Sequence, residues 1–390
     1  MTLPPCTRAA SRHWTGAICS MSVPAHTRSL TSLFRRPSYV AWTALLVVLV
    51  FEGAAVVFQL EAPPGGGSPP PTTSRSSARA SMTRGRVVSQ SDLPTLAVRP
   101  IASLLPGTVV VWGDDYYGQT DLPSGLSNVV SIAAGDGHAL ALRDDGTVVA
   151  WGSNSLGQGE VPKGLAGVAA IAAAGDHSLA LRGDGTVVAW GDDTYGQSDV
   201  PNGLVDVAAI AAGGTFSLAL KDDGAVFGWG WDEYGQTDIP VGLSHVVAIS
   251  AGRNHSLALR SDGTVVAWGV GEWGDTTVPA SLSDVVAIAA GGWHSLAVRA
   301  DGSVVGWGGS TNMLSANQQA MTVPDGLFHV YSVAAGGDMS LALRSDGTVA
   351  QWGDDPLGLI REPSGLSNVT AVAVGEQFCV AVVVPHPSAS

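Results

Sequence analysis

Residues Gly185–Pro201 read GTVVAWGDDTYGQSDVP, and the same framework returns at Gly224–Pro240 as GAVFGWGWDEYGQTDIP. Both copies keep a run that ends in Trp-Gly and a second run that ends in proline, whereas the residues between the runs differ. Fixed periods of about 20–50 residues are typical of repeat architectures, in which each unit is stabilised by its neighbours. The Trp-Gly pairs, separated by 39 residues five times and then by 45, begin at Trp112, Trp151, Trp190, Trp229, Trp268, Trp307 and Trp352.

Each repeat contains four short segments with the composition of β-strands. They are rich in β-branched or alternating apolar residues, are too short for helices, and are bounded by Gly, Asp or Pro. A glycine-containing turn such as Asp144–Gly146 follows the second segment and predicts a hairpin. Four antiparallel strands repeated radially predict a propeller blade. In one unit the segments are Asp206–Gly213, Phe216–Lys221, Ala225–Gly230 and Gly235–Pro240.

The phase of the repeats predicts how the ring closes. The periodic region begins with a third and a fourth segment, Thr108–Pro123, and ends with a first and a second segment, Asn368–Val384. We therefore expect an all-β fold over residues 101–385, a seven-bladed propeller of four-stranded antiparallel blades whose last blade takes strands from both ends. This closure avoids unpaired sheet edges. A second possibility is that Leu96–Arg99, which reads LAVR, replaces Phe378–Val383 in that blade.

An apolar segment precedes the repeats. Residues Ala41–Leu60 contain a single acid, Glu52, and are long enough to span a bilayer as a helix. Arginines shortly before this segment predict that residues 1–40 stay in the cytoplasm and that the repeats are exported to the outside of an anchored protein. A cleaved signal peptide with Ala41–Phe51 as its apolar region is the alternative, and it leads to secretion.

The remaining ends of the chain have simple compositions. Residues 61–100 are rich in Pro, Gly and Ser, which is typical of an extended linker, and residues 386–390 are a short tail. Met21 is a second possible translation start besides Met1.

Charge and cysteine content exclude several classes of function. Residues 101–390 carry nine basic and thirty acidic residues, so this part of the chain should repel nucleic acids. The three cysteines form no disulfide framework or zinc motif, and no segment has the pattern of a calcium-binding loop. We therefore expect no metal and no cofactor. Cys379 stands where other repeats have Ala or Ser, which indicates a small packed residue.

Histidines recur at the start of the second segment, but their pattern indicates packing. Three repeats have an apolar side chain at the same position, which neither a metal site nor a catalytic base would tolerate. No Ser/His/Asp arrangement repeats within reach in the sequence and no phosphate-binding loop is predicted, so we expect a protein that is not an enzyme. The position is occupied, in chain order, by His138, His177, Phe216, His255, His294, Met339 and Phe378.

The phrases GTVVAWG, GQTDIP and NHSLALRSDG (Asn254–Gly263) resemble the regulator of chromosome condensation repeat in a short form. The resemblance covers Gly107–Val384, and in unit length it is similar to the bacterial type that includes a secreted seven-bladed inhibitor of β-lactamase. It implies a non-enzymatic propeller that binds a protein with one face. The eukaryotic chromatin member, an exchange factor for a small GTPase, has longer repeats and a basic character that this sequence lacks.

The variable residues predict where a partner would bind. In an up-and-down blade, the loop between segments one and two emerges on the same face as the loop between segments three and four. Aromatic side chains, which are enriched at binding hot spots, gather in these loops together with acids. We expect a monomeric propeller whose contacts to a protein partner are made by Tyr116, Tyr117, Tyr195, Trp231, Glu233, Tyr234, Trp273 and Trp293.

Other interpretations of the same pattern stay open. The loop aromatics could pack on neighbouring blades, and Gly308–Pro324 could be a contact loop or a tolerated insertion. A carbohydrate-binding or enzymatic propeller with its site at the central channel is the main alternative function. A purely structural surface module is a third.

Overall fold

The computed structural model describes residues 46–51, 54–59, 106–271, 273–309, 321–353 and 361–385. All named elements in these ranges are β-strands, from β1 (Leu46–Phe51) to β23 (Phe378–Val383). Within these ranges there is no helix long and apolar enough to cross a membrane.

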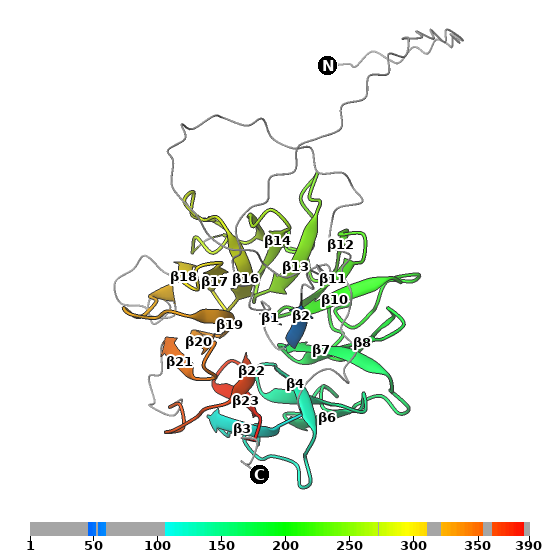
Figure 1. The fold of residues 1–390 in the computed structure, drawn as a ribbon. Helices are drawn as coiled ribbons and strands as arrows, with labels where there is room; N and C mark the ends of the chain where they lie inside the picture. The colour runs from blue at the N-terminus through cyan, green and yellow to red at the C-terminus, as the bar shows by residue number, and fades with distance from the viewer. Residues whose placement is uncertain are drawn as a thin grey trace, which may run out of the picture. The chain divides into compact units, whose positions relative to one another are not determined.

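Seven antiparallel sheets lie radially around a common axis and form the propeller (Figure 1). We number them as blades one to seven, and in each the inner strand lies nearest the axis. From the inner to the outer strand the blades are β4 (Val129–Ala134), β5 (His138–Arg143) and β6 (Val148–Gly152); β7 (Val168–Ala174), β8 (His177–Arg182) and β9 (Val187–Gly191); β10 (Val207–Ala212), β11 (Phe216–Lys221) and β12 (Val226–Gly230); β13 (Val246–Ala251), β14 (His255–Arg260) and β15 (Val265–Gly269); β16 (Val285–Ala290), β17 (His294–Arg299) and β18 (Val304–Gly308); β19 (Val330–Gly336), β20 (Met339–Arg344) and β21 (Val349–Gly353); and β22 (Val369–Val374), β23 and β3 (Thr108–Gly113).

Blade seven combines strands from both ends of the repeat region. Strand β3 pairs antiparallel with β23, from Thr108 opposite Val383 to Gly113 opposite Phe378. The rival segment, Leu96–Arg99, lies outside the described residues. Residues 1–40, the linker 61–100, the tail 386–390 and most of the insert within Gly308–Pro324 lie outside them as well.

Burial falls from the inner to the outer strand of each blade. In blade three every residue of β10 is buried, β11 is buried except for Lys221, and in β12 only Trp229 is buried. The inner strands converge on the axis, so only small side chains such as those of Ala209 and Ala211 fit between them. Cys379 is fully buried in β23, as expected for a small packed residue.

The blades are joined by a repeated hydrogen-bond pattern. In blade three the indole Nε1 of Trp229 donates to the carbonyl oxygen of Gln197, which belongs to blade two, at 3.0 Å. The hydroxyl of Ser217 donates to the same carbonyl at 2.9 Å. His177 Nε2, from blade two, lies 2.9 Å from that hydroxyl and adds a further hydrogen bond between the blades. Residues of the repeated framework therefore form the hydrogen bonds between neighbouring blades.

The prediction of a fourth strand in each blade was wrong. Every blade in the described ranges has three strands, and the fourth segment forms turns. In Gly196–Pro201, the amide of Asp199 donates to the Gly196 carbonyl at 3.1 Å, and Gly196 has a φ of 79°. Pro201 has no N–H to donate to a sheet. These backbone groups bond within the turn and do not pair with the outer strand of the blade, although the composition of the segment is typical of a strand.

The apolar segment also differs from the expected helix. The structure has β1 and β2 (Ala54–Gln59) here, paired antiparallel with Leu46 opposite Gln59. Both strands are rich in valine, whose branched Cβ favours extended backbone.

Candidate functional site

The loops at the carboxyl ends of the inner and outer strands share one face, which we call the loop face. Strands β10 and β12 both pair antiparallel with β11, so they run in the same direction and end at the same edge of the blade. The loops that follow them are Gly213–Thr215 and Trp231–Tyr234. In blade three the structure thus brings both variable loops to the loop face.

An aromatic cluster on the loop face joins blades two and three. The ring of Tyr195, from the loop after β9, lies 5.7 Å from that of Trp231, and Trp231 makes an edge contact with Tyr234 at 5.0 Å between centroids. Tyr195 and Tyr234 are about half exposed. Glu233 lies in the same loop and is exposed. Four of the eight predicted binding residues are therefore at one place.

The other four form two further pairs. Tyr116 and Tyr117 contact each other edge to face at 4.8 Å, and Tyr116 is 81% exposed. Trp273 and Trp293, from the loops of blades four and five, lie 6.3 Å apart. Tyr117 also covers Gly137, where a Cβ would come within 2.8 Å of the ring, so part of this aromatic surface packs on a neighbouring loop.

Buried glutamines hold the aromatic loops. The amide of Tyr195 donates to Gln197 Oε1 at 2.9 Å, and Gln197 Nε2 donates to Asp192 Oδ2 at 2.7 Å. Asp193 accepts the Ser198 amide at 3.0 Å. Many loop acids therefore stabilise the turns that present the aromatic rings. In the described ranges, no three His, Cys, Asp or Glu side chains come together as a metal site.

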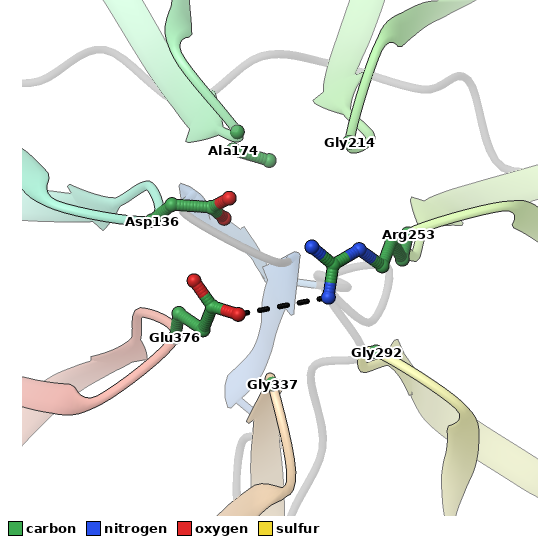
Figure 2. A pocket seen from close by; sticks show the side chains of 8 residues that line it. Asp136, Ala174, Gly214, Arg253, Gly292, Gly337 and Glu376 are labelled. Carbon is green, nitrogen blue, oxygen red and sulfur yellow. Dashed lines mark ion pairs between the residues drawn. The ribbon is translucent and has the colours of Figure 1, made fainter.

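A small pocket lies at the axis, in the middle of the loop face. Figure 2 shows Asp136, Arg253 and Glu376 pointing toward one another over this opening, which has about 20 Å³ of space for water-sized molecules. Arg253 Nη1 lies 3.6 Å from Glu376 Oε1, and its guanidinium carbon lies 5.9 Å from the ring centroid of Trp293. The sequence showed each residue in its loop, but only the ring geometry makes the loops of distant blades meet.

The carboxyl group of Asp136 ionises less readily than an ordinary aspartate. Surrounding protein and the nearby charge of Glu376 raise its pKa from 3.8 to about 6, although water reaches the side chain. The folded state therefore binds a proton here more tightly than the unfolded chain does, so this group costs stability as the pH rises from about 4 to 6.

We expect Asp136→Asn to raise the thermal unfolding temperature at pH 7.5 and to leave it unchanged at pH 4. Scanning calorimetry at both pH values checks this; an equal effect at both would contradict it.

A Ser/His/Asp arrangement is present between blades four and five. Asp275 replaces the glutamine of other repeats, and its Oδ2 lies 3.4 Å from His255 Nδ1, while His255 Nε2 lies 3.0 Å from Ser295 Oγ. All three side chains are fully buried between blades four and five. The Ser295 hydroxyl donates to the Asp275 carbonyl at 3.1 Å. A substrate could not reach this hydroxyl, so the arrangement acts as a blade contact.

Five segments of the chain match a known repeat family. The Regulator of chromosome condensation (RCC1) repeat matches residues 129–158, 168–197, 207–236, 246–272 and 285–312. No curated protein sequence gives a match.

Several solved structures share the fold. Prp20p from Saccharomyces cerevisiae, described with its binding to Gsp1p and histones, is 21% identical with a TM-score of 0.59 and covers 73% of this chain and 93% of its own. Human WBSCR16 is 19% identical with a TM-score of 0.53, covering 70% of this chain and 99% of its own. The ectodomain of the Physcomitrella patens receptor kinase CR4 is 23% identical with a TM-score of 0.53, covering 66% and 70%.

Proposed function

Because five matched repeats place this chain in the regulator of chromosome condensation repeat family, we propose that it is a non-enzymatic propeller that binds a protein partner through its loop face. The observation that carries this proposal is the cluster of Tyr195, Trp231 and Tyr234, partly exposed and held by two adjacent blades. Rigid aromatic side chains bury much area on binding with few torsions to freeze. Binding by Prp20p to Gsp1p and histones is in keeping with a propeller that takes protein partners.

A site for a sugar or a larger substrate at the axis has less support. The axial opening has about 20 Å³ of space, enough for a single small group and too little for a sugar ring. The buried position of Ser295 likewise argues against hydrolysis by that hydroxyl.

Placement outside the cytoplasm is part of the proposal. Although the structure has β1 and β2 here, the sequence of residues 41–60 is apolar and preceded by arginines, and an anchor or a cleaved signal of this composition would export the propeller. Fusing residues 1–100 to a reporter enzyme that is active only after export tests this placement. An inactive, cytoplasmic fusion would contradict it.

We expect Trp231→Ala to weaken partner binding by at least tenfold, because truncating a hot-spot tryptophan costs about 2 kcal/mol or more. The full chain is used to capture proteins from the extracytoplasmic fraction of its source, and the captured protein is purified and titrated by calorimetry. Phe328→Ala is the matched control, since Phe328 is 61% exposed and precedes β19 on the opposite face.

The two variants separate the possible outcomes. Loss of affinity in Trp231→Ala with less than a twofold change in Phe328→Ala supports the loop face as the binding surface. A partner bound equally by both variants, or lost only with Phe328→Ala, overturns the assignment of the face. Failure to capture any protein that depends on either residue overturns the function.

A further inference from the structure

The mouth of the axial pocket is built from one equivalent position in all seven blades. Four of these positions are glycines, and at Gly214 and Gly337 an added Cβ would lie 2.7 Å and 2.6 Å from the carbonyl oxygen of the next loop. Close backbone packing therefore excludes side chains there. The three positions that do carry side chains are all charged. In blade order the seven are Asp136, Gly175, Gly214, Arg253, Gly292, Gly337 and Glu376.

The charges at this mouth do not balance. Asp136 and Glu376 face a single cation, Arg253, and the charge of Asp176 lies close enough to raise the pKa of Asp136 further. The contact of Arg253 with Glu376 is long, at 3.6 Å, and both side chains are nearly half exposed, so it contributes little and opens easily. The Asp136 carboxylate points into the pocket (Figure 2), where the charge of Arg253 and a backbone hydrogen bond from Gly175 only partly offset the effects of desolvation and of Glu376.

We propose that this axial pocket binds one cationic side-chain group, a lysine ammonium or an arginine guanidinium, presented by the protein on the loop face. The cation lies between Asp136 and Glu376 and adds a second positive charge, besides that of Arg253, next to the two carboxylates. The identity of its carrier rests on the proposed function, whereas the pocket's preference for a cation does not.

Size and charge favour this occupant over others. The opening holds a group about the size of an ammonium ion, so a lysine ammonium would enter it whole and an arginine guanidinium would enter with one NH₂ group. An anion would meet Arg253 but also two carboxylates at the same mouth, and like charges at close range are destabilising.

Binding should depend on pH with a defined sign. With the pKa of Asp136 at about 6, the carboxylate is about one-tenth ionised at pH 5 and almost fully ionised at pH 7.5. The groups facing it are Asp176, Arg253 and Glu376, and the adjacent buried His138 has a pKa of about 3 and stays neutral. Affinity for a cation should therefore be about tenfold higher at pH 7.5 than at pH 5.

Thermal unfolding of the full chain with n-butylammonium chloride tests the proposal without any protein partner. Ethylguanidinium chloride is the second arm, and NaCl at equal ionic strength and 1-butanol are the controls. At ten times its dissociation constant, the cation should raise the unfolding temperature by about 2–4 °C at pH 7.5. The shift should disappear in Asp136→Asn and Glu376→Gln but remain in Asp325→Asn, an exposed acid before β19.

The outcomes are distinct. A shift by one organic cation alone supports the site and identifies which side chain it takes. No shift by either cation, or the same shift in Asp136→Asn and Asp325→Asn, overturns the proposal. A shift in a chain that captures no partner leaves the cation site standing and removes only the proposed function.

Discussion

Lowering the pH from 7 to 5 is expected to reduce the free energy of unfolding by about 2 kcal/mol for each of four buried histidines. Burial lowers the pKa of His138 and His255 to about 3 and that of His177 and His294 to about 4. The unfolded chain, with a histidine pKa near 6.5, binds protons that the folded protein cannot accept. Stability is therefore complete above about pH 6.5 and is lost as the pH falls toward 4.

Replacing His177 by phenylalanine tests this explanation directly. Phe216 and Phe378 occupy the same position in blades three and seven and are fully buried, so the substitution should keep the fold at pH 7. The variant should lose about a quarter of the acid sensitivity that the four histidines produce. Urea unfolding from pH 5 to 7, followed by circular dichroism, gives the slope. Equal slopes for the variant and the unaltered protein would rule out the buried histidines as the cause.

Replacing Trp229 by alanine is expected to cost about 3–5 kcal/mol of unfolding free energy. The indole is 7% exposed, packs in the hydrophobic core, and donates to Gln197 of the preceding blade. The substitution removes the largest side chain of β12 and a contact between blades. The midpoint of guanidinium unfolding measures the loss.

A second substitution separates the two parts of this effect. Trp229→Phe keeps most of the apolar volume but removes the Nε1 donor, so its cost should be about 1–2 kcal/mol. Trp273→Ala, on the loop face, should change stability far less than Trp229→Ala because Trp273 is 37% exposed. A cost for Trp229→Ala below 1 kcal/mol would contradict its role in holding the blades together.

Much of the fold could be predicted because the repeat frame is local in sequence. Trp229 and the position of Phe216 recur at fixed distances from glycine turns, so strand type and burial follow from the pattern alone. The fourth segment could not be predicted correctly, because the choice between strand and turn at Gly196–Pro201 depends on hydrogen bonds to Asp193 and to the next blade. These local turn bonds, together with the contact of Gln197 with the next blade, outweigh strand composition there.

The site was predictable to a lesser extent. The loops that carry Tyr195 and Trp231 differ in sequence from repeat to repeat, which pointed to the loop face, and the structure places both residues in one cluster. The axial pocket could not be predicted, since Asp136 and Glu376 are far apart in the sequence and meet only when the ring is formed. Asp275 was visible as a departure from glutamine, but its contact with His255 depends on how neighbouring blades pack.

The most direct test of a partner-binding loop face is hydrogen–deuterium exchange of the full chain, alone and with its captured protein. The loop amides at 192–195 and 231–234 should exchange more slowly in the complex, because these loops carry Tyr195, Trp231 and Tyr234. The hairpin turns at 144–146 and 261–263, on the opposite face, should be unchanged. Protection confined to those turns, with no change at 192–195 and 231–234, would contradict the account.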